Sequence, residues 1–265
     1  MATQTSDRQI DALDRGHGYL DLEGWGLTGV NGADAEGWLN DLITASTREL
    51  GTGRALRSLL LSPTGRIRAD FHVLRTATGD GFVLLQGPGS PDPIADLLAP
   101  YVLSSEVELE PAGRTVPLVR PGPGPAWAAT WAEPDDDAVR VGAGAFETWR
   151  IRHGIARFPV DLDADSLPAE AGLDVEPVID RAKGCYLGQE SVARVRNLGH
   201  PPRVVIAVRA ARPLRRGQAV FADGLETGTV TSTEPGGGAA AMVRVRWDAR
   251  ETELRADGDI LLERR

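Results

Sequence analysis

The sequence predicts an α+β protein that ends in a small β-barrel. Three features of the 265-residue chain lead to this prediction. Residues 33–103 have the pattern of a helix, a hairpin, a strand and a second helix, in that order. A segment of alternating proline and glycine at 120–127 interrupts this unit. Short β-rich runs with glycine turns follow Pro201 and Pro202, and closely spaced strands of this kind are typical of a barrel or sandwich.

The first predicted element is a core-facing helix over residues 33–43. Its apolar residues recur at i, i+3, i+4 and i+7, and they are Ala35, Trp38, Leu39 and Leu42. Asn31 stands just before this segment and is the expected N-cap, because a short polar side chain can accept a hydrogen bond from the first turn.

A β-hairpin is predicted over residues 55–75, since Pro63 and Gly65 favour a turn between two extended runs. In the second run, apolar and polar residues alternate with a period of two. Arg68, Asp70 and His72 should therefore share the face opposite Ile67, Ala69, Phe71 and Val73. A third strand is expected at 81–87. A second helix is expected at 93–103, with Ile94, Leu97, Leu98 and Tyr101 on one face.

The Pro/Gly segment and the change of texture after Pro201 divide the chain into three predicted units, at 1–120, 126–200 and 203–265. The middle unit contains an aromatic and β-branched segment, 146–158, followed by an extended acidic segment, 159–178. In the last unit the runs that predict strands are 204–208, 218–222, 227–233 and 240–247.

Charge and cysteine usage narrow the range of functions. The chain has 29 Lys and Arg against 38 Asp and Glu, a net charge of −9, so it should repel a phosphate backbone and we expect no direct nucleic-acid binding. One cysteine cannot form an internal disulfide, which fits a reducing compartment. The N-terminus lacks the apolar run of a secretory signal, and no stretch approaches the roughly 18 apolar residues of a membrane span. We therefore expect a cytoplasmic protein without a membrane partner.

The sequence KGCYLGQE, Lys183 to Glu190, surrounds the single cysteine. The window 180–203 contains five basic residues, Arg181, Lys183, Arg194, Arg196 and Arg203, against the acids Asp180 and Glu190. A positive neighbourhood lowers the pKa of a thiol, so Cys185 is a candidate reactive group. Gly184 and Gly188 permit close approach of a ligand, and Gln189 offers amide hydrogen bonds.

The same residues permit a purely structural interpretation. A lone cysteine is most often a small buried hydrophobic residue. The glycines then serve as turn residues, and Gln189 and Glu190 begin a helix, where a carboxylate suits the dipole. The four histidines, His17, His72, His153 and His200, show no metal-ligand spacing, so no stably bound metal is predicted.

Residues 167–203, which contain KGCYLGQE, resemble the signature region of the YgfZ family of folate-binding proteins. The hallmark of that family is K-G-C-[YF]-x-G-Q-E, and all seven of its specified positions match between Lys183 and Glu190. The segments 27–50 and 59–75 resemble the first helix and the hairpin of this family and of its relative, the glycine-cleavage T-protein. The segment 150–162 resembles the entry into the second half.

This resemblance implies a three-domain, ring-like fold with a central channel for tetrahydrofolate or a related reduced folate, and a C-terminal β-barrel. It also implies a role in assembling or repairing iron–sulfur clusters, with client enzymes or assembly proteins as partners. Some of these clients modify tRNA, so that link is indirect. By analogy Cys185 is the functional thiol and Asp70 faces the folate pocket, although a solvated strand residue is the plain alternative for Asp70. Lys183, Gln189 and Glu190 are expected to position the thiol or to meet the anionic folate tail.

A folate-dependent one-carbon transferase is the main alternative, because T-proteins transfer an aminomethyl group to tetrahydrofolate. Those enzymes usually have Glu-Ala where this chain has Arg152 and His153. A guanidinium in place of a carboxylate reverses the charge where a pterin needs an acceptor. T-proteins also lack the cysteine motif. The resemblance thus favours an assembly factor over a conventional enzyme, and a folate-binding scaffold with a structural Cys185 is the third interpretation.

Overall fold

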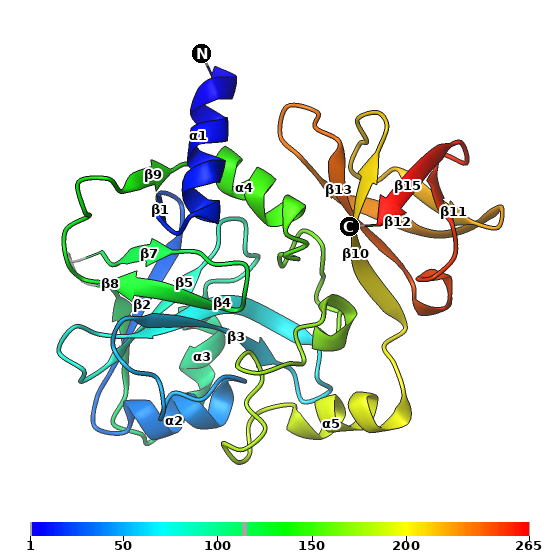
Figure 1. Ribbon diagram of the computed structural model, residues 1–265. Coiled ribbons are helices and arrows are strands. Elements are labelled where there is room, and N and C mark those ends of the chain that lie inside the picture. The colour runs from blue at the N-terminus through cyan, green and yellow to red at the C-terminus, as the bar shows by residue number, and fades with distance from the viewer. Residues whose placement is uncertain (1, 113–115, 265) are drawn as a thin grey trace.

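The computed structural model describes residues 2–112 and 116–264 (Figure 1). The predicted unit 1–120 thus includes residue 1 and residues 113–115, which lie outside the described residues. The α-helices are α1 (Ala2–Asp14), α2 (Ala35–Leu42), α3 (Ile94–Leu98), α4 (Ala143–Arg152) and α5 (Gln189–Leu198). The 3-10 helices are η1 (Ala99–Tyr101), η2 (Pro168–Ala171) and η3 (Trp247–Ala249). No helix among the described residues is long and apolar enough to cross a membrane.

The larger part of the molecule is built around a seven-stranded antiparallel sheet, with the strand order β6-β2-β5-β4-β3-β8-β7. Its strands are β2 (Gly26–Asn31), β3 (Arg54–Leu61), β4 (Ile67–Arg75), β5 (Phe82–Gln86), β6 (Glu108–Pro111), β7 (Leu118–Arg120) and β8 (Ala126–Thr130). The predicted hairpin is the β3–β4 pair, and the predicted third strand is β5.

Both faces of this sheet are covered. Helices α2 and α3 lie on one side, where Leu39 and Ile94 pack against Phe71 and Val73 of β4 (Figure 1). On the other side lie α1 and α4 and a small parallel pair, β1 (Gly18–Leu20) and β9 (Val139–Val141). The polar face of β4 therefore meets other protein groups over part of its length, and this shapes the site described below.

Two local predictions differ from the structure. Asp34, and not Asn31, is the N-cap of α2, and the amide of Asn31 donates to Glu110 Oε1 at 2.8 Å. The difference arises because Gly32 and Ala33 extend the approach to the helix before its first turn. The second predicted helix, 93–103, is shorter than expected, since α3 ends at Leu98 and the chain tightens into η1.

The Pro/Gly segment is a turn within one sheet. Strands β7 and β8 flank residues 121–125 and pair with each other, and β8 also pairs with β3. Strand pairing therefore crosses the expected boundary between 120 and 126, and the division at this point stays a prediction. Proline and glycine stop a strand, but they also suit the turn that joins two strands. The aromatic segment 146–158 begins in α4 and continues as turns.

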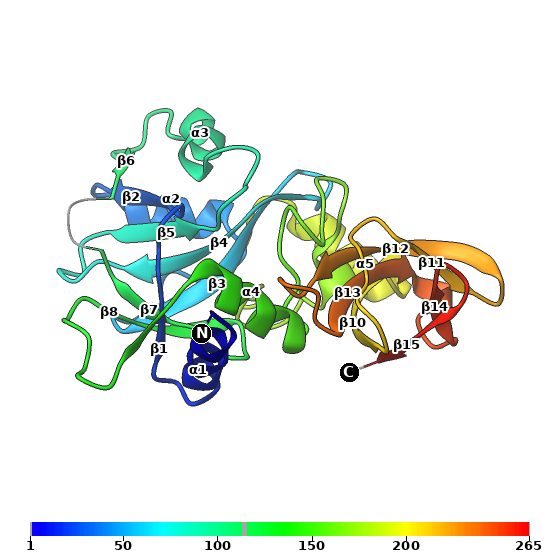
Figure 2. The same ribbon diagram turned by 90° about the horizontal axis from the view of Figure 1, so that it is seen from above.

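The C-terminal residues form the predicted barrel, which is closed with the strand order β10-β13-β12-β11-β14-β15. Its strands are β10 (Arg203–Ala210), β11 (Ala219–Ala222), β12 (Leu225–Thr233), β13 (Ala240–Arg246), β14 (Leu254–Ala256) and β15 (Ile260–Arg264). The α+β fold with a C-terminal barrel is thus confirmed. Strands β14 and β15 were not predicted, because they are short and carry charged residues. Figure 2 shows the barrel beside the larger part of the molecule.

Buried ion pairs join the barrel to α4 and to the acidic segment. Arg150 Nη1 donates to Asp161 Oδ2 at 2.7 Å, and both side chains are almost completely buried. Asp161 Oδ1 accepts from Ser232 of β12 at 2.6 Å. Nearby, Arg244 of β13 donates to Glu170 of η2 at 2.7 Å. Buried charges need such partners, so these bonds fix the barrel relative to α4.

We expect Asp161→Asn to lower the free energy of unfolding by about 3 kcal/mol, because it removes the buried charge that faces Arg150. Urea unfolding followed by circular dichroism measures this. The control is Asp248→Asn, which breaks an exposed pair with Arg246 and should change the free energy by less than about 1 kcal/mol. Equal effects of the two substitutions would contradict the role given to Asp161.

Candidate functional site

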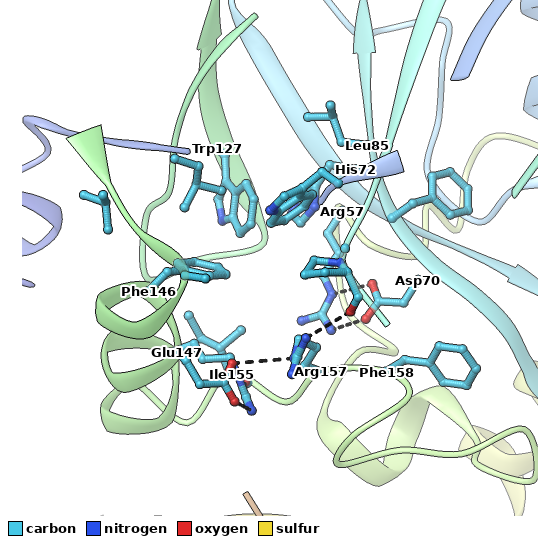
Figure 3. Close-up of a pocket in the computed structure, with 18 of the residues that line it drawn as sticks. Arg57, Asp70, His72, Leu85, Trp127, Phe146, Glu147, Ile155, Arg157 and Phe158 are labelled. Atoms are coloured by element: carbon cyan, nitrogen blue, oxygen red, sulfur yellow. Dashed lines mark hydrogen bonds and ion pairs between the residues drawn. The ribbon is translucent and has the colours of Figure 1, made fainter. Parts of the chain in front are cut away.

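A cavity of about 430 Å³ lies between the sheet, α4 and the turns that follow α4. Its lining comes from segments far apart in the sequence, including β3, β4, β8 and residues 155–158. Figure 3 shows these side chains around an open centre, with Trp127 and His72 on one side and Glu147 and Arg157 on the other. The volume is within the usual range for small-molecule sites.

Aromatic rings form one wall of the cavity. Trp127 is the central ring, and it meets Trp25 at a centroid distance of 6.5 Å and Phe146 at 5.9 Å. His72 stacks on Trp127 with centroids 3.6 Å apart. Burial, aided by the nearby charge of Arg57, holds the pKa of His72 well below its usual value, so this ring is neutral. A flat, uncharged ring system suits such a wall.

Asp70 lines the cavity as half of an ion pair. Arg57 donates to its carboxylate twice, from Nε at 2.9 Å and from Nη2 at 2.6 Å, and each side chain is only 9% exposed. Arg57 also donates to the carbonyl of Ala156 at 2.7 Å. Asp70 therefore lines this cavity, and it is not a solvated strand residue. Whether it contacts a folate stays a prediction.

The sequence reasoning missed most of this lining, including Arg57, Glu147 and Arg157. One signal was present for Arg57. In the hairpin its register partner is His72, so Arg57 lies on the same face of the sheet as His72 and Asp70. Glu147 and Arg157 carried no such signal, because α4 and the following turns were not predicted as separate elements.

None of the residues 183–190 lines the cavity. Lys183 instead anchors its loop to the chain after α2, because its ammonium donates to the carbonyls of Ile43 and Ala45 at 2.6 and 2.7 Å. Its Nζ also lies 5.6 Å from the centroid of the Tyr186 ring. Burial lowers the pKa of Lys183 to about 8.

The rest of the motif has the geometry of a turn followed by a helix. Gly188 has a φ of 84°, and a Cβ atom there would lie 2.6 Å from the carbonyl oxygen of Ser62 in the hairpin turn. Helix α5 then begins at Gln189, whose amide donates to the carbonyl of Gly184 at 3.2 Å. Glu190 is paired with Arg194 on the surface. Gln189 and Glu190 thus occupy the helix start that the structural interpretation predicted.

Cys185 is exposed, so the interpretation of a buried thiol does not hold. Two of the arginines that were expected to make the surroundings of Cys185 positive are bonded to other groups. Arg181 donates to the carbonyl of Asp174, and Arg194 donates to Glu190. No group of three or more His, Cys, Asp or Glu side chains that could hold a metal occurs among the described residues.

Comparison with known proteins agrees with the fold and the motif. No family model matches the chain. Proteins named tRNA-modifying protein YgfZ are similar to it, at 26% identity over 229 residues for Shigella dysenteriae, covering 70% of each chain. The YgfZ of Cronobacter sakazakii is 29% identical over 223 residues, covering 68% of this chain and 67% of that protein. The chain is a homologue of these YgfZ proteins.

The fold is that of the T-protein. The solved structure of glycine cleavage system aminomethyltransferase T from Bartonella henselae superimposes with a TM-score of 0.73 over 96% of this chain and 86% of that one, at 20% identity. At this identity the likeness shows the fold alone. The relation between YgfZ and the T-protein that the sequence suggested is therefore confirmed. Arg152, which stands where T-proteins usually have glutamate, donates to Glu234 near the barrel, and it does not line the cavity.

The exposure of Cys185 predicts fast labelling of the folded protein. We expect its thiol to react with a small disulfide reagent at a rate within about tenfold of that in the urea-unfolded chain, since access does not limit the reaction. Because the chain has one cysteine, Cys185→Ala supplies the blank. A native rate slower by several orders of magnitude would mean that the thiol is covered in solution.

The lowered pKa of Lys183 predicts that the stability of the folded chain depends on pH. Its pKa is about 8 in the folded chain and 10.5 as an ordinary value, so between these pH values the unfolded state binds more protons. The free energy of unfolding should therefore rise with pH in this window. In Lys183→Met the rise from this group is absent. Urea unfolding of both proteins at intervals from pH 7.5 to pH 9.5 measures the difference, and parallel curves would refute the assignment.

Proposed function

We propose that this chain binds tetrahydrofolate, or a related reduced folate, in the aromatic cavity and supports iron–sulfur cluster assembly or repair on client enzymes through Cys185. The observation that carries the proposal is the combination of two separate features. One is a cavity with an aromatic wall and paired charges in a T-protein fold. The other is a single exposed thiol on a loop that does not line this cavity.

The residues around the cavity fit a folate. Trp127 and Phe146 offer apolar surface to a flat pterin ring, and Asp70, Glu147 and Arg157 offer hydrogen-bonding groups for its polar edge. The fold supports this assignment, because the similar solved structure is an aminomethyltransferase T.

The thiol suits a transient role. A single thiolate supplies one ligand, whereas clusters are held by several, so the remaining ligands come from a client or from another small molecule. The similar proteins are named tRNA-modifying proteins. In our proposal the link to tRNA passes through client enzymes, because the net charge of −9 disfavours direct binding of a polyanion.

A tetrahydrofolate-dependent one-carbon transferase is the second candidate, and the T-protein fold favours it. Against it stands the pairing of Asp70. Both of its oxygens already accept from Arg57, so a proton taken from a substrate would have to displace one of these hydrogen bonds. The assembly role needs no proton transfer by Asp70, so it agrees better with the geometry.

Calorimetric titration with tetrahydrofolate, combined with complementation, tests the proposal. We expect Cys185→Ala to bind tetrahydrofolate as the wild type does, yet to fail to restore iron–sulfur enzyme activities in cells that lack the gene. Asp70→Ala should lose at least about tenfold in affinity, because it leaves the buried Arg57 without its partner and disturbs the cavity. Full complementation by Cys185→Ala would instead support the transferase or a folate-binding scaffold.

A further inference from the structure

Besides the paired Arg57 and Asp70, the cavity is lined by two further charged side chains, Glu147 and Arg157. Glu147 lies on α4 directly after Phe146, and Arg157 lies in the turns that follow the helix. Arg157 Nε is 3.6 Å from Glu147 Oε2, which is too far for a hydrogen bond. Figure 3 shows both side chains at the open centre, across from Trp127.

Arg157 has unused capacity to donate. Its Nη1 donates to the carbonyl of Pro88 at 3.2 Å, but its Nε is buried and has no hydrogen-bond partner in the described structure. Burial lowers the pKa of Arg157. The acceptor nearest to Nε is Glu147 Oε2, at 3.6 Å. Nη2 of the same guanidinium has no hydrogen bond within the described structure and is not among the buried unpartnered atoms, so it is the donor that Arg157 offers to a molecule in the cavity.

Glu147 has unused capacity to accept. Arg150 donates to both of its oxygens, from Nε to Oε2 at 2.7 Å and from Nη2 to Oε1. A carboxylate has about four acceptor positions, so these bonds leave about two. Its side chain is 23% exposed, compared with 9% for Asp70, whose oxygens face Arg57. Glu147 is therefore the more accessible of the two carboxylates.

We propose that Glu147 and Arg157 together recognise the 2-amino-4-oxopyrimidine edge of a ring that lies against Trp127. This edge presents two adjacent N–H donors, at N3 and at the 2-amino group, beside one carbonyl oxygen. The donors match the free acceptor positions of Glu147, and the carbonyl matches the donors of Arg157. Pterins and guanine share this edge. The inference rests on the proposed function in naming a folate as the ligand, and it assigns the specificity to residues other than Asp70.

The test is calorimetric titration of the wild type and of Glu147→Gln with three probes: tetrahydrofolate, its 2-desamino-2-methyl analogue, and guanosine. For the wild type we expect tetrahydrofolate to bind at least about 30-fold more tightly than the analogue, since the analogue leaves a carboxylate oxygen unpaired. In Glu147→Gln the affinity for tetrahydrofolate should fall at least about tenfold, and the two ligands should differ by less than about threefold.

Two further variants keep the result interpretable if Glu147→Gln is unstable. Arg157→Gln should weaken tetrahydrofolate and the analogue by the same factor, because both keep the 4-oxo group. Glu36→Gln is the control, since it removes one carboxylate that pairs with an arginine, Arg75, away from the cavity. It should leave both affinities unchanged. Thermal unfolding of each variant shows whether it is folded.

Each outcome separates this inference from the proposed function. If tetrahydrofolate binds and Glu147→Gln keeps the wild-type preference over the analogue, the inference is wrong and the folate proposal stands. If guanosine binds with the expected dependence on Glu147 and tetrahydrofolate does not, the edge recognition is right and the folate proposal is wrong. If no probe binds the wild type, both are wrong.

Discussion

The buried pair of Arg150 and Asp161 is the interaction on which the rest of the structure depends. Arg150 lies on α4, and this helix also supplies Phe146 and Glu147 to the cavity. Its partner Asp161 accepts from Ser232 of the barrel. Asp161 also accepts from the backbone N–H of Arg157 at 3.0 Å, so the same carboxylate holds the turn that brings Arg157 to the cavity. One buried charge pair thus positions the helix, the turn and the barrel together.

The β3–β4 hairpin connects the cavity with the cysteine loop. Its middle carries the Arg57–Asp70 pair, and its turn contacts the start of α5. There Ser191 Oγ donates to the carbonyl of Pro63 at 3.2 Å, and the absence of a side chain at Gly188 permits close contact with Ser62. Lys183 adds a second attachment, to the chain after α2. The thiol is therefore presented by a loop with several attachments, although the thiol itself is exposed.

The periodicity of the apolar residues was sufficient to predict the elements that have one apolar face and one polar face. Helix α2, the hairpin and four barrel strands are of this kind. The cavity was harder to predict, because its charged lining departs from the apolar pattern and its residues come from segments that only tertiary contacts bring together. Asp70 was found through resemblance, and Glu147 was not found at all. The exposure of Cys185 also could not be decided, since a single residue has no period.

The separation of thiol and cavity constrains how the proposed folate and the proposed cluster could meet on this chain. The cavity has a volume of about 430 Å³ and an aromatic wall, which suits one small molecule. Cys185 is on the surface, where a macromolecule can approach. A group bound in the cavity and a group bound at the thiol therefore occupy different places and do not compete for space. The β3–β4 hairpin is one physical connection between them, since Arg57 and Asp70 line the cavity and the carbonyl of Pro63 in the turn accepts from Ser191 of α5. Residues 62–66 of the hairpin turn do not line the cavity. Substitutions there would therefore shift the loop that presents Cys185 and leave the lining of the cavity unchanged.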